Sequence, residues 1–135
     1  WLLALGNSRS ADALPAVQRH AISDDPGVRT AALDALGTLP GTAALGALVQ
    51  RTVTETEPSV RAHAAETLAA REEPASLRLV DELLVREPDP DVRTAALRPL
   101  ARKLPNPDAL RLLERSAAGD PDANVRRFAA ESLQR

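Results

Sequence analysis

A short pattern occurs four times along this chain at intervals of 32 or 33 residues, and it constrains the fold more than any other feature. The pattern is an acid, a proline, a valine and an arginine in that order, and its copies begin at Asp25, Glu57, Asp89 and, more loosely, Asp120. Each valine is followed four residues later by an alanine and eight residues later by a leucine. Such agreement indicates an internal repeat, in which each copy is one supersecondary unit.

The spacing of valine, alanine and leucine is the apolar stripe of an amphipathic helix. The acid is suited to cap this helix, and proline suits its first position. Alanine and leucine dominate while aromatic residues make up 1%, which favours helices over strands and predicts an all-α protein. We expect four such B helices, at about 27–38, 59–71, 91–104 and 123–134, each preceded by an A helix, at about 12–23, 42–55, 74–87 and 106–119.

Three local features add expectations to this scheme. Pro15 is compatible with the first A helix if Asp12 is its cap, because no backbone donor is needed in the first turn. Pro99 should kink the third B helix, and we expect that curvature to lie on a solvent-facing side. The fourth copy has two extra residues, Ala123 and Asn124, before its valine, which predicts a longer turn there.

The motif of acid, proline, valine and arginine followed by alanine and leucine resembles HEAT repeats, especially the short phycobilisome-lyase-like subclass. The resemblance implies an α-α superhelix, a HEAT-like solenoid, with A helices on the convex side and B helices lining the concave side. The residues themselves also require an array, because one hairpin cannot bury its apolar faces alone.

The resemblance spans the whole chain. We expect a single HEAT-repeat domain over 1–135, with four hairpins as repeats at about 7–38, 39–71, 72–104 and 105–135. Residues 1–6 resemble the end of a preceding helix, and the chain starts at Trp1, so we interpret it as a fragment of a longer array.

The recurring acids and arginines are candidates for a structural ladder. A guanidinium presents donors in a fixed fork that suits the carboxylate and carbonyls of a neighbouring turn, so it can tie one repeat to the next. The residues of this ladder are Asp25, Arg29, Glu57, Arg61, Asp89, Arg93, Asp120 and Arg126.

The second, sixth and tenth residues after each valine should form the solvent-facing stripe of the B helices. This stripe is the predicted partner-binding surface, and its candidate residues are Thr30, Asp34, Glu66, Thr94, Arg98, Arg102, Arg127 and Glu131. Arg98 and Arg102 are its best anchor for an acidic partner. We therefore predict a non-catalytic scaffold for protein–protein interaction that binds a protein or peptide of unknown identity, and the sequence does not indicate the oligomeric state.

Other functional classes find little support. The two histidines, His20 and His63, lie in different repeats, the chain has no cysteine, and no phosphate loop or nucleophile motif is present, so we expect no enzyme activity, metal or cofactor. A net charge of −2 and a stripe without aromatic residues disfavour nucleic acid. No apolar run reaches the roughly 20 residues of a membrane span, and the cytoplasm is the default expectation for location.

Three alternatives stay open. The chain could be a subunit of a phycobilisome-lyase-like enzyme, as the resemblance implies, although no residue stands out as catalytic. It could be a lipid-transfer helical module, since Ala4–Ser8 resembles a turn of vitellogenin-like domains. It could also be a HEAT appendage of a larger enzyme.

Overall fold

The computed structural model describes residues 11–135, and every regular element in this part of the chain is a helix. The predicted all-α class is confirmed. The expected helix end at residues 1–6 and the turn at residues 4–8 lie outside the described residues. The elements are the short 3-10 helix η1 (Ala11–Ala13) and the α-helices α2 (Leu14–Ala21), α3 (Pro26–Thr38), α4 (Thr42–Thr54), α5 (Pro58–Ala70), α6 (Pro74–Arg86), α7 (Pro90–Arg102), α8 (Pro107–Gly119) and α9 (Ala123–Leu133).

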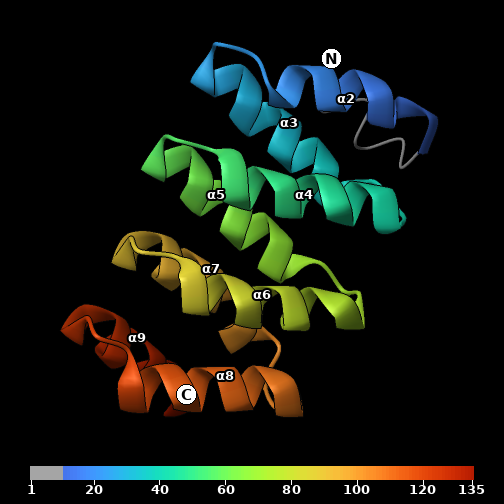
Figure 1. Cartoon of the computed structure of the whole chain (residues 1–135). Coiled ribbons are helices and arrows are strands. Elements are labelled where there is room, and N and C mark those ends of the chain that lie inside the picture. Colours follow the sequence, from blue (N-terminus) through green and yellow to red (C-terminus); the bar gives the residue numbers. More distant parts are fainter. Residues whose placement is uncertain (1–10) are drawn as a thin grey trace.

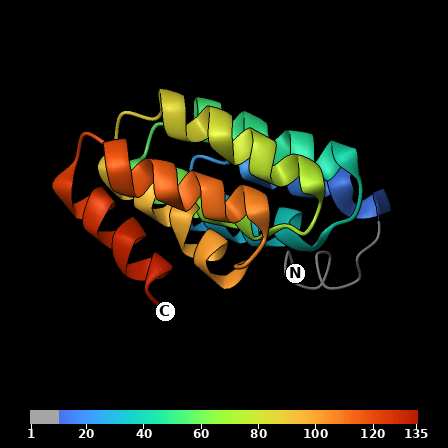
Figure 2. The ribbon, with the colours of Figure 1, turned by 90° about the horizontal axis from the view of Figure 1, so that it is seen from below.

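The helices pair into antiparallel hairpins that stack along one axis, from α2–α3 at one end to α8–α9 at the other (Figure 1). Seen along this axis, the A helices (α2, α4, α6 and α8) form one layer and the B helices (α3, α5, α7 and α9) form the other (Figure 2). Successive B helices contact each other more extensively than successive A helices do. The array therefore curves with the B helices on its inner side. None of the described helices is long and apolar enough to cross a bilayer.

The acid and proline of the repeat start the B helices as expected. The side chain of Asp25 accepts a hydrogen bond from the amide of Gly27 at 2.8 Å, and Asp89 does the same for Asp91 at 2.8 Å. Glu57 occupies the cap position of α5 but makes no side-chain capping bond. Proline at the first position of each of these helices needs no partner for a backbone donor, so the helix begins without cost there.

The expected longer turn before α9 is wrong. The cap of α9 is Asp122, and Val125 lies three residues after it, the same spacing as Val92 after the cap Asp89. Three residues join α4 to α5, α6 to α7 and α8 to α9 alike. The extra residue of the last repeat instead lies between α7 and α8, which four residues join where three join the earlier hairpins.

The first hairpin departs from expectation at both ends of its A helix. The cap of α2 is Ala13 and not Asp12, because residues 11–13 form a 3-10 turn before the helix. Pro15 does lie in the first turn of α2. Ile22, which the apolar pattern assigns to this helix, follows its last residue and is 69% exposed.

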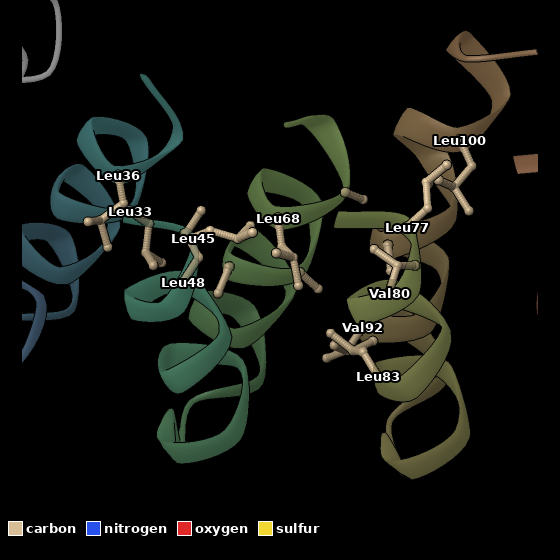
Figure 3. Packing of buried hydrophobic residues seen from close by; sticks show 14 of the residues in the cluster. Leu33, Leu36, Leu45, Leu48, Leu68, Leu77, Val80, Leu83, Val92 and Leu100 are labelled. Carbon is tan, nitrogen blue, oxygen red and sulfur yellow. The ribbon is translucent and has the colours of Figure 1, made fainter. Parts of the chain in front are cut away.

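The repeated aliphatic stripe forms the core between the layers (Figure 3). The alanines four residues after each valine are all 0% exposed, and Leu36, Leu68 and Leu100 are at most 1% exposed. Only Val28 and Leu133, at the two ends of the stripe, are partly exposed. The core is built from many aliphatic contacts, each small, so replacing one of its leucines by alanine is expected to cost about 2–5 kcal/mol.

Pro99 lies inside α7 without ending it and is buried. The expectation that its curvature falls on a solvent-facing side is therefore wrong. The pair α5 and α7 makes the most extensive helix–helix contact among the described elements. Small residues line both helices of this pair, including Ala65 and Ala69 on α5 and Ala95 on α7, which allows the two backbones to approach closely.

Two glycines within helices provide a matched test of packing between hairpins. A β-carbon on Gly46 of α4 would meet nothing within 4 Å, whereas one on Gly37 of α3 would lie 2.8 Å from Thr67 Cγ2 of α5. Gly46→Ala should raise the free energy of unfolding by about 0.5–1 kcal/mol. Gly37→Ala should be about 1–3 kcal/mol less stable than Gly46→Ala, because overpacking separates α3 from α5. Urea denaturation measures both, and equal effects would contradict the close approach.

Candidate functional site

Three arginines at the start of the B helices each bind the carboxylate of the next hairpin. In every case Nε and Nη2 of the guanidinium donate to the acid that ends the next A helix. The pairs are Arg29 with Glu55, Arg61 with Glu87 and Arg93 with Asp120, and their closest N–O distances are 2.8, 2.9 and 2.9 Å. These bonds tie each hairpin to its successor.

The same arginines also hold the turn of their own hairpin. Nη1 of each donates to a backbone carbonyl six residues earlier, in the turn that precedes its helix. Arg126 of α9 makes this bond as well, to the carbonyl of Asp120 at 2.7 Å. Each guanidinium therefore fixes the position of two turns at once, and its fork geometry sets their separation.

The acids of this arginine ladder are not those expected. Asp25 and Asp89 cap helices, and Glu57 takes no part in it. Asp120 belongs to the ladder, but its carboxylate binds Arg93 while Arg126 takes only its carbonyl.

The partners that the sequence reasoning missed, Glu55 and Glu87, precede the cap by two residues. An acid recurring five residues before the valine, at Glu55, Glu87 and Asp120, was the signal that could have identified them.

The ladder carboxylates are held from two sides. Besides the arginine, each accepts the backbone amide of the cap residue two positions later, as Glu87 does from Asp89 at 3.1 Å. Burial alone would raise the pKa of Glu55, but hydrogen bonds from Arg29, the amide of Glu57 and Arg51 outweigh it and lower the pKa from its ordinary value of 4.5. The pKa of Arg93 is raised because Asp120 accepts its hydrogen bonds, although partial burial opposes the rise.

Loss of a ladder carboxylate should destabilise the array. Glu87→Gln leaves Arg61 facing a neutral amide in a mostly buried position, and we expect a loss of roughly 2–4 kcal/mol in the free energy of unfolding. The control is Arg98→Gln, which removes an exposed pair with Glu66 at 3.6 Å and should cost less than about 0.5 kcal/mol. Chemical denaturation of both variants tests this. A cost at Glu87 no larger than that at Arg98 would show that the ladder does not hold the hairpins together.

The lowered pKa of Glu55 predicts a pH dependence. Since the unfolded chain binds the proton more readily, Glu55 contributes stability above its ordinary pKa of 4.5, and that contribution is lost as pH falls through the folded value. Glu55→Gln cannot titrate, so its free energy of unfolding should fall less steeply between about pH 5 and pH 3 than that of the parent. Exposed Glu57→Gln, outside the ladder, is the control. Identical slopes for Glu55→Gln and the parent would disprove the linkage.

A second set of cations lies at the other end of the B helices. Arg71, 7% exposed, donates from Nη1 to the carbonyls of Leu36 and Leu39 at 2.6 and 2.8 Å and pairs with Glu73. Lys103 stands 32 residues later and donates to the carbonyl of Arg71 at 2.6 Å. Both satisfy carbonyls where a preceding helix ends, where positive charge is favourable. Burial lowers the pKa of Lys103, although nearby carboxylates partly oppose this.

The predicted partner-binding stripe lies on the outward side of the B helices, which we call the B-helix face. Two of its acids pair with the next repeat: Asp34 with His63 at 2.6 Å, and Glu66 with Arg98 at 3.6 Å. Arg102 is exposed and makes no ion pair with any described residue. The other predicted residues make local contacts or are exposed: Thr30 and Thr94 donate to carbonyls of their own helices, Arg127 donates to Asn124, and Glu131 is exposed.

A shallow cavity of about 280 Å³ opens on this face between α3, α5 and α7. Among its lining residues are Asp34, His63, Glu66 and Arg102. The fold thus brings three of the predicted residues together, one from each of three successive B helices. His63 is an addition, because sequence reasoning considered it only as a metal ligand. The predicted residues outside this cavity are Thr30, Thr94, Arg98, Arg127 and Glu131.

Comparison with known proteins places this array in a family. The family described as HEAT repeats matches residues 2–69 and 45–134, nearly the whole chain. The chain belongs to the HEAT-repeat family. A search of curated proteins gave no match.

Among solved structures, the HEAT array is similar to a chain of the complex of CpcE and CpcF of phycocyanin lyase from Nostoc sp. PCC7120. The two are 22% identical, with a TM-score of 0.66, over 98% of this chain and 86% of that chain. This likeness shows a shared fold. The resemblance to HEAT repeats predicted from the sequence, with its α-α superhelix, is confirmed.

The chemistry available on the B-helix face of this HEAT array is that of exposed charges and hydrogen-bonding groups. Acid and base alternate across it, from Asp34 and His63 to Glu66, Arg98 and Arg102. Over residues 11–135, no three histidine or acidic side chains converge as metal ligands would. Such a face can hold a partner through several hydrogen bonds and ion pairs spread over successive repeats.

Proposed function

We propose that this HEAT array is a non-catalytic scaffold that binds a protein or peptide partner across its B-helix face. The observation that carries the proposal is the cavity into which α3, α5 and α7 contribute Asp34, Glu66 and Arg102. A partner lying there contacts three repeats at once. HEAT-repeat membership supports the same class of function.

Charge on the face favours a polar partner. The pairs Asp34–His63 and Glu66–Arg98 have side chains about one third to one half exposed, so their atoms can exchange partners with an incoming chain at little cost. Arg102 remains a cation without an ion-pair partner among the described residues. A protein segment with an acidic group at Arg102 therefore complements this surface.

Charge reversal on the B-helix face should abolish partner binding. The variant Arg98→Glu with Arg102→Glu introduces repulsion toward an acidic segment and should change the free energy of unfolding by less than about 0.5 kcal/mol, as expected at exposed sites. The matched control is Arg78→Glu with Arg111→Glu on the A helices. Arg111 makes a comparable exposed pair, with Asp81 at 3.6 Å.

The measurement is quantitative capture by the immobilised full chain from an extract of its source organism, followed by mass spectrometry. A specific partner should be retained by the parent and the A-helix control, and lost from the Arg98 and Arg102 variant. Equal loss from both double variants would refute the assignment of the face. Melting of the Arg98 and Arg102 variant would mean that these arginines are structural.

A second candidate is a subunit of a phycobilisome-lyase-like enzyme. The fold match over 98% of this chain to a component of phycocyanin lyase favours it. Lyase activity toward phycocyanin, measured with the full-length protein, would support this candidate over the scaffold alone. The lipid-transfer module and the enzyme appendage remain proposals without a specific contact to support them, and co-purified lipid or an attached catalytic domain would favour them.

A further inference from the structure

The arginine ladder has one rung whose outer half is open. Arg29, Arg61 and Arg93 each use Nη1 for their own turn and Nε with Nη2 for the carboxylate of the following hairpin. Arg126 makes the first bond, to the carbonyl of Asp120 at 2.7 Å, so its fork is fixed like the others. Among the described residues nothing accepts from its Nε and Nη2. The guanidinium is therefore held ready for a carboxylate.

An acidic counterpart lies beside it on α8. Asp81, the eighth residue of α6, accepts Arg115 and Arg111 of the following A helix at 2.6 and 3.6 Å. Glu114 is the eighth residue of α8 and is exposed, with no ion pair to a described residue. The position that receives arginines in the third hairpin thus carries an unpaired acid in the fourth.

The apolar core is also less covered at this end. Leu133 of α9 is partly exposed, whereas Leu36, Leu68 and Leu100 at the same place in earlier repeats are at most 1% exposed. Arg126 is partly exposed too, whereas Arg93 is 6% exposed. The side of α8 and α9 that carries Glu114, Arg126 and Leu133, here called the terminal face, therefore continues the interface that joins the earlier hairpins.

We propose that the terminal face binds a further helical hairpin, one that carries an acid in its inter-helix turn and an arginine on its first helix. The acid would bind Arg126 as Glu87 binds Arg61, and the arginine would bind Glu114 as Arg115 binds Asp81. This surface is distinct from the B-helix face, so the two sites can be occupied together.

A second copy of this chain, stacked head to tail, does not fit. At the place of Glu55 and Glu87, the first hairpin has Ser23, whose hydroxyl accepts the amide of Asp25 at 3.1 Å. A copy would bring this hydroxyl, and not a carboxylate, to Arg126. The terminal face is therefore selective for a hairpin with an acidic turn.

The fourth repeat itself supplies a suitable probe. A second copy of residues 103–135 placed directly after Arg135 keeps the repeat register, because Arg135 and Arg102 both lie ten residues after their valine. The copied hairpin brings its own Asp120 to Arg126, and its Arg111 and Arg115 to Glu114. Amide hydrogen exchange of the extended full chain then reports whether the added hairpin docks.

We expect amides of the added hairpin to be protected at least tenfold over the same amides when its Asp120 is replaced by Ser, in imitation of Ser23. Arg126→Gln should remove the same protection, and a double-mutant cycle of the two changes should show coupling. Arg127→Gln, an exposed neighbour, is the control and should leave protection unchanged. Protection unaffected by Asp120→Ser, or an added hairpin never protected, would overturn the proposal. Either result leaves the capture experiment on the B-helix face untouched.

Discussion

Burial of one aliphatic stripe is the constraint on which the rest of the structure depends. A hairpin of two short helices has apolar surface on the sides that face both its neighbours, and only stacking removes that surface from water. Ala64 and Ala96 at the centre of the stripe are fully buried and small, which lets the B helices come close together. Closer packing of one layer than the other curves the array, and the B helices take the inner side.

Burial is not directional, so the polar contacts decide how the hairpins align. The arginine ladder fixes the turns at one end of the B helices, while Arg71 and Lys103 fix their other ends through carbonyls of the preceding repeat. Fork geometry makes the first contact specific in distance and angle. Two such lines of contact leave the B-helix face between them free for exposed, exchangeable pairs such as Asp34 with His63.

The sequence predicts the helices well because their starts are coded locally. Asp25 with Pro26, and Asn106 with Pro107, mark helix starts through capping and ring geometry, and the aliphatic period gives the buried side. Local rules failed where a motif had two acids to choose from. Asp120 matched the letters of the repeat, but Asp122 provides the cap, and this moved the ladder by two residues.

Contacts between repeats are harder to predict from a sequence. Arg71 reaches carbonyls more than 30 residues earlier, and a carbonyl has no sequence signature. The cavity on the B-helix face could be predicted in part, since the face follows from helix periodicity. That Asp34, Glu66 and Arg102 share one cavity depends on the stagger between helices. Pro99 illustrates the same limit, because its burial follows from the neighbour it meets and not from its own helix.

The three-residue connection inside the hairpins has a consequence for how such arrays diversify. Every atom of it is used, as the carboxylate, the cap and the carbonyl that the arginine grips, so a deletion or insertion there would uncouple two hairpins. The connection between hairpins is freer and already differs by one residue between α7 and α8. Length variation among homologous arrays should therefore accumulate at the outer loops, while growth in copy number proceeds by whole units.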